Sequence, residues 1–326
     1  MQDNWQKFLV QQTANIEDGL EHASAVDIFT DLSPFHVLAI AGEDSEGFLH
    51  GQFASDVSAL AVNEVQQSSW CNIKGRVIAS FLLYRSHDCF YLILERELAD
   101  IVTKRLRMFV LRSRVSIDDK SEDLIRIGIR GEDTHNHLNQ FLESIPETGT
   151  LSLLSIKDNP VRSIILCPPA QAESLWQHLA EKSIAVDSKL WSMYDIRAGI
   201  AWIGKSNSEE FLPQSLNMDL TGGLSFDKGC YPGQEIIARM HFRGKLKQRL
   251  FLAQVPGNEA AAVKTKLFIA ELTQHIGMVV NSIMLGNNKC LMLAVLDLEI
   301  DRSDVHLNSV DGPKIEVLTL PYSQDS

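Results

Sequence analysis

Residues 222–235 (GGLSFDKGCYPGQE) combine four glycines with a cysteine, a lysine and two carboxylates, and the apolar run after them is typical of a helix. Glycine lets the backbone approach another group closely, and Pro232 suits the first position of a helix. We therefore expect Cys230 to lie just before a helix N-terminus, with Lys228 two residues earlier. Both features lower the pKa of a thiol. Local chemistry alone nevertheless favours the alternative, a glycine-rich turn in which Cys230 is a small buried residue.

The composition is typical of a soluble globular protein with more than one domain. The chain has 326 residues, of which 45% are hydrophobic, and this length favours two or three domains. The net charge of −12 argues against broad nucleic-acid binding, which requires Lys and Arg to neutralise phosphates. The N-terminus lacks the basic-then-apolar pattern of a signal peptide, and no run approaches the ~18 apolar residues of a membrane helix. We expect a cytoplasmic protein with no direct contact to nucleic acid or membrane.

Few residues have the spacing of a metal site. The five cysteines are far apart, odd in number and without a C-x-x-C pair, which argues against zinc, iron–sulfur and disulfide frameworks and fits a reducing compartment; they are Cys71, Cys89, Cys167, Cys230 and Cys290. The run His135-Asn136-His137 has no further ligand nearby in the sequence, so we expect a surface role and no metal. Walker, nucleophile-elbow and Rossmann glycine patterns are absent from the sequence.

The order of predicted elements indicates an α+β protein with three parts. Residues 1–117 predict a first αβ domain after an irregular lead-in over about 1–30, and residues 118–244 predict a second αβ domain. Residues 245–326 change to short strands without a long helix, which is typical of a small β-barrel. The predicted strands cover 35–40, 65–72, 77–85, 89–94, 115–117, 124–129, 163–167, 250–255, 266–269, 277–283, 290–298 and 314–320. The predicted helices cover 44–52, 97–108, 134–144, 170–181 and 190–198.

Residues 228–235 resemble the K-G-C-Y/F-x-G-Q-E signature of the YgfZ proteins, folate-binding relatives of the glycine-cleavage T-protein, an aminomethyltransferase. Residues 51–57 (GQFASDV) are similar to the family's G-Q-x-x-x-D-V, and residues 72–76 (NIKGR) to its D-x-K-G-K/R. Residues 239–244 (RMHFRG) resemble its R-x-x-F/Y-R-G continuation. The resemblance runs from about residue 32 to the C-terminus. It implies two ferredoxin-like αβ domains, which can be discontinuous, and a C-terminal barrel around a central folate cavity.

The resemblance also implies which residues would hold the folate, with tetrahydrofolate as the expected form. The rings of a folate favour aromatic or apolar faces, and its glutamate tail favours cations. Trp191 and Phe35 occupy positions where the family has folate-contacting aromatics. The remaining candidates lie in or beside the signature: Tyr231, Gln234, Glu235 and Arg239. The alternative is that both aromatics belong to the core, where most aromatic side chains pack.

Two departures from the family pattern affect the expected pterin site. The family commonly has L-x-x-E-A-G where this chain has Arg197-Ala198-Gly199, and arginine cannot accept hydrogen bonds from the pterin donors. Asp195 lies two residues earlier and would point elsewhere on a helix, so Asp56 is the candidate replacement. Asn72 stands in place of an aspartate and removes a further negative charge.

The resemblance implies a folate-binding accessory protein that sustains iron–sulfur enzymes and thereby affects tRNA modification indirectly. Cys230 would be the working residue, and Lys228 with the helix N-terminus would hold its thiolate. We expect iron–sulfur client proteins as partners and a monomeric chain, and we lean towards a protein that is not itself an enzyme. One alternative is an aminomethyltransferase that moves a one-carbon unit from a lipoyl carrier to tetrahydrofolate, although Arg197 and Asn72 count against it. Another is an interaction scaffold whose folate site has decayed.

Overall fold

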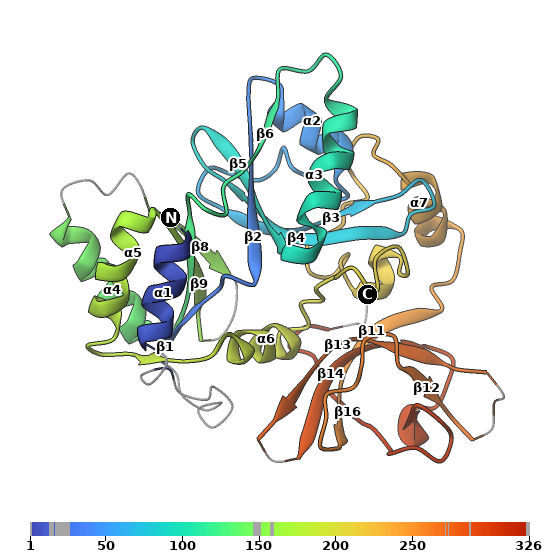
Figure 1. Cartoon of the computed structure of the whole chain (residues 1–326). Coiled ribbons are helices and arrows are strands. Elements are labelled where there is room, and N and C mark those ends of the chain that lie inside the picture. Colours follow the sequence, from blue (N-terminus) through green and yellow to red (C-terminus); the bar gives the residue numbers. More distant parts are fainter. Residues whose placement is uncertain are drawn as a thin grey trace. The chain divides into compact units, whose positions relative to one another are not determined.

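The computed structural model describes residues 2–12, 16, 27–145, 151–156, 160–270, 272, 274–286 and 288–323. Within these ranges, helices combine with three sheets into an α+β fold, which confirms the predicted class (Figure 1). The contacts divide the chain into two compact units. Unit 1 consists of Met1–Ser45, Leu60–Gln66 and Leu82–Trp191, and unit 2 of Glu46–Ala59, Gln67–Phe81 and Ser192–Ser326. The three-domain division and its ferredoxin-like halves stay a prediction.

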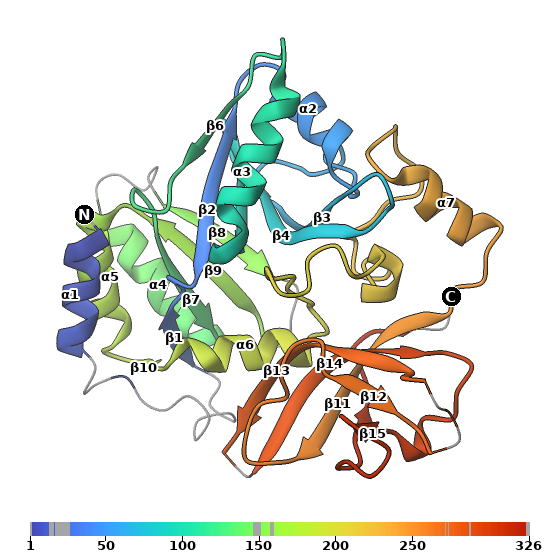
Figure 2. The ribbon, with the colours of Figure 1, turned by 45° about the vertical axis from the view of Figure 1, so that its right-hand side comes forward.

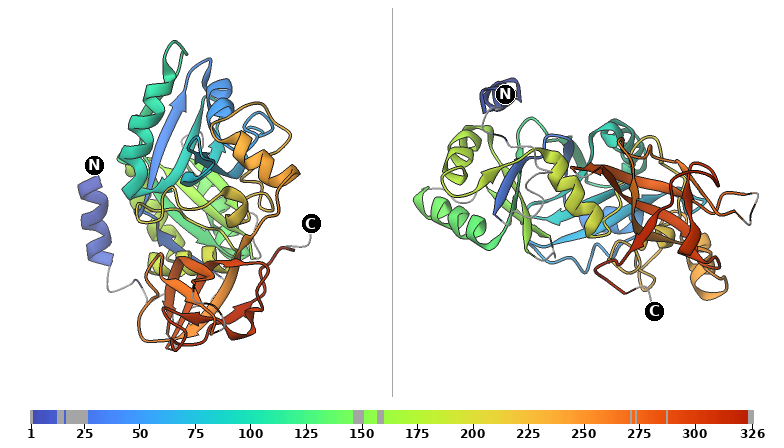
Figure 3. Two further views of the ribbon diagram at one scale, coloured as in Figure 1. Left: turned by 90° about the vertical axis from the view of Figure 1, so that its right-hand side faces the viewer. Right: turned by 90° about the horizontal axis from the view of Figure 1, so that it is seen from below.

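The first sheet lies in unit 1 and carries helices on one face. Its strand order is β10 (Ile184–Ala185), β1 (Ile28–Asp31), β7 (Ile125–Arg130), β9 (Arg162–Cys167) and β8 (Ser152–Ile156). The covering helices are α1 (Gln2–Gln12), α4 (Glu132–Ser144) and α5 (Pro169–Leu179), as Figures 1 and 3 show. Trp176 on α5 lies at the centre of this core, 4.7 Å from the ring of Phe29 and 5.6 Å from that of Trp5. The burial of these large aromatics stabilises the unit.

The expectation of an irregular lead-in over residues 1–30 is wrong where the structure describes it. Gln2–Gln12 is a helix and Ile28–Asp31 is a strand of the sheet. Trp5 and Phe8 are three residues apart and therefore share a helix face; they are 2% and 7% exposed. The indole N–H of Trp5 also donates to Asp31 Oδ1 at 2.8 Å. The first helix thus belongs to the core, while residues 13–15 and 17–26 lie outside the described ranges.

The second sheet has the order β3 (Val65–Cys71), β4 (Val77–Arg85), β5 (Cys89–Glu95), β2 (Phe35–Ala41) and β6 (Ser116–Asp119). Strands β3 and β4 run through both units. In unit 1, α3 (Arg96–Val110) packs on β2 and β5. Of the apolar face predicted from the sequence, Leu98, Val102 and Leu106 are buried and Ile101 is half-buried; Ala99 is buried beside them. In unit 2, α2 (Ser45–Gln52) buries Phe48 and Leu49, also as predicted.

The third sheet curls into a half-barrel in unit 2 (Figure 2). Its order is β15 (His306–Leu307), β12 (Lys266–Phe268), β13 (Gly277–Leu285), β14 (Lys289–Asp297), β11 (Gln248–Pro256) and β16 (Glu316–Leu318). The register between β13 and β14 shifts between Val279 and Asn281, and such a bulge bends a strand and increases its twist. All five strands predicted for this region are present. The two-residue strand β15 was not predicted.

The segment between the first two sheets and the half-barrel contains α6 (Ser188–Arg197), a 3₁₀ turn at Pro213–Leu216 and α7 (Gln234–Phe242). The helix predicted after the glycine-rich stretch is therefore present, but it does not begin at Pro232. Gly233 precedes its first residue with φ 83°, a left-handed conformation that glycine adopts without steric cost. In the described ranges, no helix is both long and apolar enough to cross a membrane.

Candidate functional site

Lys228 attaches the signature loop to the chain that follows α2. Its ammonium donates to the backbone carbonyls of His50, Phe53 (2.6 Å) and Ser55 (3.1 Å). A lysine ammonium has three donors, so these carbonyls use all of them. Burial lowers the pKa of Lys228 to about 8, and the Asp56 carboxylate opposes that shift. The loop is thus anchored by a cation that has lost most of its hydration.

The structure gives Lys228 a different neighbourhood from the one predicted. We expected its charge beside the Cys230 thiolate, but its donors point at carbonyl oxygens. Cys230 is exposed, and over the described ranges no hydrogen bond or ion pair reaches its Sγ. The ring of Tyr231 lies beneath the ammonium, with its centroid 4.9 Å from Nζ, and is 7% exposed. Burial raises the pKa of Tyr231, so this phenol stays neutral below the alkaline range.

Two segments that resemble the family pattern meet backbone to backbone in unit 2. The turn over residues 72–76 is closed by Asn72, whose Oδ1 accepts from the N–H groups of Lys74 (2.9 Å) and Arg76 (3.0 Å). A Cβ added to Gly233 would lie 2.4 Å from the Asn72 carbonyl oxygen and 2.7 Å from the Gly75 Cα. Real Cβ atoms do not approach so closely, so only glycine fits at position 233.

Asp56 forms the acidic part of the same neighbourhood. Its Oδ1 accepts from Ser58 N (3.1 Å), Ser58 Oγ (2.9 Å) and Ala59 N (3.3 Å). The same oxygen lies 3.3 Å from His50 Nδ1, which is 2.8 Å from Ser58 Oγ. Desolvation would raise the pKa of Asp56, but these hydrogen bonds and His50 outweigh it and lower the pKa. Asp56 is therefore an ionised, partly exposed carboxylate at neutral pH.

The comparisons with known proteins agree with the motif geometry. No family model matches the chain. The chain is 28% identical to the "tRNA-modifying protein YgfZ" of Enterobacter sp. (strain 638) over 303 residues, 90% of this chain and 92% of the relative. The resemblance to the YgfZ proteins is confirmed. The glycine cleavage system aminomethyltransferase T from Bartonella henselae has the same fold, with a TM-score of 0.69, 14% identity and coverage of 93% of this chain and 88% of that one.

The other residues of the YgfZ-like signature lie around α7. Gln234 Nε2 donates to the Lys228 carbonyl at 3.4 Å, so it helps to close the loop. Glu235 is in the first turn of the helix, as predicted, and Arg239 is in its last turn; both are exposed. At the end of the helix, the exposed ring of Phe242 continues an aromatic surface in which His241 stacks on Phe226 at 3.8 Å.

Phe35 and Trp191 belong to unit 1, whereas the signature residues belong to unit 2. Both aromatics are buried, at 6% and 1% exposed. The Arg162 guanidinium lies over the Trp191 ring at 4.8 Å, and a Cβ on Gly128 would lie 2.7 Å from the same ring. Both side chains are therefore packed in the interior of unit 1, and their contact with a folate stays a prediction.

Arg197 occupies the position at which the YgfZ pattern has a glutamate. Arg197 is exposed at the end of α6. Asp195 is 2% exposed and accepts from the Trp202 indole N–H at 2.9 Å, so it points into the interior, away from the Arg197 side, as expected. Of the carboxylates considered for the pterin donors, Asp56 is the one that solvent reaches.

The expectation that His137 has a surface role is wrong, because this side chain is 3% exposed. His137, His178 and Glu181 offer ligand atoms within 4.8 Å of one another. The two imidazoles are stacked, however, with centroids 3.8 Å apart and planes at 19°. Each Nε2 bonds to the backbone carbonyl of the other histidine, at 2.7 and 3.0 Å. In-plane lone pairs of stacked rings cannot converge on one ion, so this cluster fastens α4 to α5.

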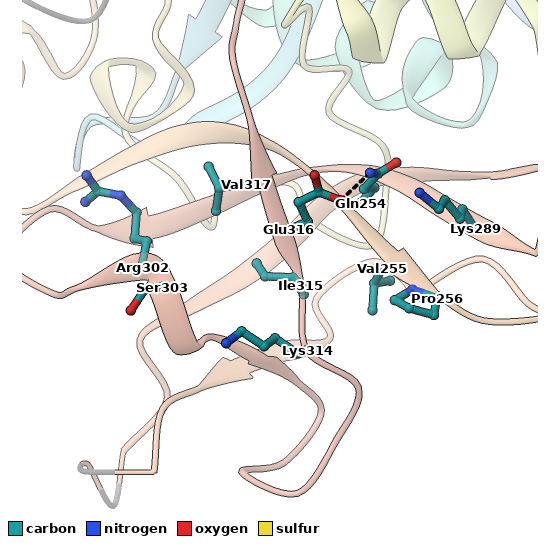
Figure 4. A pocket seen from close by; sticks show the side chains of 10 residues that line it. All are labelled: Gln254, Val255, Pro256, Lys289, Arg302, Ser303, Lys314, Ile315, Glu316 and Val317. Carbon is teal, nitrogen blue, oxygen red and sulfur yellow. Dashed lines mark hydrogen bonds between the residues drawn. The ribbon is translucent and has the colours of Figure 1, made fainter.

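The half-barrel carries a cavity of about 510 Å³ that none of the predicted site residues lines (Figure 4). Its lining consists of Gln254, Val255, Pro256, Lys289, Arg302, Ser303, Lys314, Ile315, Glu316 and Val317. Arg302 is fixed over the Phe251 ring at 4.7 Å, and Lys314 pairs with Asp304 at 3.0 Å. Three cations against one carboxylate favour an anion here, but one of these cations already has its partner.

Proposed function

We propose that the chain is a folate-binding accessory protein that sustains iron–sulfur enzymes in the cytoplasm and thereby supports tRNA modification. The Enterobacter relative is named as a tRNA-modifying protein, and this supports a role in tRNA modification. The observation that carries the proposal is the anchoring of residues 228–235 by Lys228 to the carbonyls of the 50–55 segment. This contact joins two segments that resemble the YgfZ pattern and brings an ionised carboxylate and an exposed thiol into one unit.

The described contacts suggest how the residues would serve tetrahydrofolate. Asp56 would accept the hydrogen bonds of the pterin N–H donors, since it is ionised and partly exposed. Arg239 would attract the glutamate tail from its exposed position on α7. Trp191 and Phe35, both of unit 1, stay candidates for contact with the folate rings. The thiol of Cys230 would act towards the folate or a partner protein, because it is exposed and its loop is fixed by Lys228.

A second candidate is a tetrahydrofolate-dependent aminomethyltransferase. The similarity of fold to the Bartonella aminomethyltransferase T favours it. Exposed Arg197, which stands where the pattern has a carboxylate, argues against it because arginine offers no acceptor. The two candidate functions are distinguished by incubating the purified protein with an aminomethylated lipoyl carrier and tetrahydrofolate. Formation of methylenetetrahydrofolate over many turnovers would favour the transferase, and its absence the accessory protein.

The proposal is tested by anaerobic calorimetric titration of tetrahydrofolate into the wild type, Cys230→Ala and Asp56→Asn. We expect saturable binding in the wild type and in Cys230→Ala. We expect about tenfold weaker binding in Asp56→Asn, which corresponds to about 1.4 kcal/mol. Asp227→Asn is the matched control, because it removes another exposed carboxylate of unit 2, from the loop that Lys228 anchors. Absence of heat with folded wild-type protein would contradict folate binding.

The link to iron–sulfur enzymes needs a cellular measurement. In cells that lack this protein, we expect reduced activity of an iron–sulfur enzyme that thiolates tRNA, and restoration by the wild-type gene but not by Cys230→Ala. Cys71→Ala is not a suitable control, because Cys71 is buried and its loss would disturb packing. Cys89→Ser is the better control, since Cys89 is partly exposed and lies in unit 1. Equal restoration by Cys230→Ala would remove the thiol from the proposed function.

A further inference from the structure

The end of α7 (Figure 2) carries ring side chains that take no part in the proposed folate site. The imidazole of His241 stacks on the Phe226 ring, with centroids 3.8 Å apart and planes at 15°. The Phe242 ring stands at 81° to that of His241 and at 68° to that of Phe226. Phe242 is 69% exposed, so solvent reaches its ring. Single exposed apolar residues are ordinary, but a cluster of rings at the surface indicates a binding site.

The segment that carries two of these rings is basic, although the chain as a whole is acidic. Residues 239–249 (RMHFRGKLKQR) contain five Lys and Arg residues and no Asp or Glu, in a chain with a net charge of −12. Two of these five cations have a carboxylate partner from elsewhere in unit 2. Lys245 pairs with Glu299 at 2.7 Å, and Arg249 pairs with Asp219 at 2.6 Å.

The guanidinium groups of Arg239 and Arg243 are left for another anion. Both side chains are exposed, and in the part of the chain that the structure describes no hydrogen bond or ion pair engages either guanidinium. The Arg243 N–H donates to the Arg239 carbonyl at 3.0 Å, so the two residues lie one helical turn apart. Phe242 is three residues after Arg239 and shares its side of the helix. An exposed ring is therefore flanked by two cations without a carboxylate partner.

We propose that this surface binds a short stretch of single-stranded nucleic acid, with a base stacked on Phe242 and phosphates held by Arg243 and Arg239. Stacking on an aromatic side chain tolerates any sequence, because every base has a π face. A guanidinium group matches the geometry of a phosphate through paired N–H donors. The ligand thus supplies both the flat ring and the anion that the surface lacks. The inference goes beyond the proposed function, in which tRNA modification is supported through iron–sulfur enzymes, and does not rest on it.

The overall charge decides which form of nucleic acid fits. The net charge of −12, on which the expectation of no direct contact to nucleic acid rests, argues against binding through charge alone. Binding of that kind would favour a duplex, which has the higher charge density. A duplex also hides the faces of its bases, whereas a single strand offers them to Phe242. We therefore expect single strands to bind and duplexes not to compete with them.

The test is the fluorescence anisotropy of labelled octauridylate, in its ribose and deoxyribose forms, titrated with the full-length protein. In the wild type we expect saturable binding, and a tighter ribose form would identify RNA as the ligand. Phe242→Leu keeps an apolar side chain but removes the ring, so we expect about tenfold weaker binding. Phe242→Tyr keeps the ring and should bind as the wild type does. Arg243→Gln should reduce the slope of log affinity against log salt by about 0.7, which corresponds to one phosphate contact.

Phe109→Leu is the matched control, because it removes another exposed phenylalanine at the end of a helix, in unit 1. It should leave the affinity unchanged. Equal affinities of the wild type and Phe242→Leu would overturn the inference, as would a blunt RNA duplex that competes equally well at equal phosphate concentration. Absence of saturable binding to the folded wild type would also overturn it, and would leave the surface to an acidic protein segment. Circular dichroism checks the folding of each variant.

Calorimetry with tetrahydrofolate on the same proteins keeps this inference apart from the proposed function. Phe242 is not a candidate for folate contact, so Phe242→Leu should bind tetrahydrofolate as the wild type does. Folate binding by a wild-type protein that binds no oligonucleotide would overturn only the nucleic-acid inference. Oligonucleotide binding by a wild-type protein that binds no folate would overturn only the folate proposal. Arg239 is not substituted, because it takes part in both.

Discussion

Each unit contains one cationic side chain that donates to three backbone carbonyls: Arg126, which is buried, and Lys228, which is half-buried. In unit 1, Arg126 donates through Nη1 to the carbonyls of Ser121 (2.6 Å) and Leu124 (2.7 Å), and through Nη2 to that of Ser33 (3.4 Å). In unit 2, Lys228 donates to three carbonyls of the segment after α2. Each cation thus supplies hydrogen-bond donors to three backbone carbonyls.

The two sites differ in what their charge can do. Burial lowers the pKa of Arg126 to about 10, against the opposing carboxylate of Asp31, so this guanidinium stays charged at every physiological pH. Burial lowers the pKa of Lys228 to about 8, close to the working range. Arg126 is 1% exposed in the core, whereas Lys228 lies under a loop with an exposed thiol. The same kind of contact therefore stabilises the core at Arg126 and holds the loop with the exposed thiol at Lys228.

Removal of the core cation should have the largest effect. Arg126→Met removes the Arg126 donors from the Ser121 and Leu124 carbonyls and the counter-charge from the Asp31 carboxylate. We therefore expect a loss of about 3–5 kcal/mol in the free energy of unfolding. Urea unfolding followed by tryptophan fluorescence measures this loss. Lys104→Met, on the exposed face of α3, should change it by less than about 0.5 kcal/mol. Similar losses in the two variants would show that Arg126 is not needed by the core.

A second substitution asks whether the loop depends on its backbone packing as much as on Lys228. Gly233→Ala places a Cβ 2.4 Å from the Asn72 carbonyl oxygen at φ 83°, and we expect a loss of about 3 kcal/mol. Gly229→Ala places it 3.7 Å from His50 Nε2 without a positive φ, so its cost should be within about 0.5 kcal/mol. Thermal unfolding of the two variants provides the measurement. A mild Gly233→Ala would mean that the two backbone segments can move apart.

Lys228→Met should cost less than Arg126→Met, because solvent can reach part of the site and supply new partners for the carbonyls. We expect about 2 kcal/mol, together with faster proteolysis within residues 222–233. The same urea series gives the first value, and mass analysis of a brief protease digest gives the second. A loss as large as that of Arg126→Met would remove the distinction between core and loop cations.

The pH dependence of the same pair follows from the lowered pKa of Lys228. The unfolded lysine keeps its proton up to about 10.5, whereas the folded one loses it near 8, so between these values the unfolded state binds more protons. Stability then rises with pH through this term. The difference in unfolding free energy between wild type and Lys228→Met should therefore grow from pH 8 to pH 10. A constant difference would mean that the carbonyls hold the ammonium as strongly as water does.

The sequence predicted those helices and strands whose formation depends on residues close together in the chain. The spacing of Leu98, Ile101, Val102 and Leu106 predicted α3. The short strands after residue 245 predicted a small β-barrel, and the structure has these strands in a half-barrel. The first helix was missed because its apolar face is small, and its stability comes from packing on Trp176, far away in the sequence. The start of α7 was misplaced because Gly233 adopts a positive φ, a requirement set by the neighbouring turn at Gly75.

The sequence predicted which residues belong to the candidate site, but it did not predict which of them are in contact. The eight-residue signature located Lys228 and Cys230, and the short segment around Asp56 was also recognised. The sequence separation of Lys228 from its carbonyl partners is more than 170 residues, and no spacing rule reports such a contact. His50 was missed for the same reason, since its place beside Gly229 exists only in the folded chain.

The smallest expected effect concerns His306. Its pKa is raised, whereas the pKa values of Arg126 and Lys228 are lowered. The Gly312 carbonyl and the Asp304 carboxylate raise the pKa of His306 above 6.5, against a smaller opposing desolvation. Its stabilising contribution is therefore complete below pH 6.5 and is lost as the pH rises through the folded-state pKa. Between pH 6 and pH 8 the melting temperature of the wild type should fall slightly more than that of His306→Gln. The difference should be smaller than any effect above because solvent screens the pair. Identical pH dependence in the two proteins would show that the Asp304–His306 contact does not form in solution.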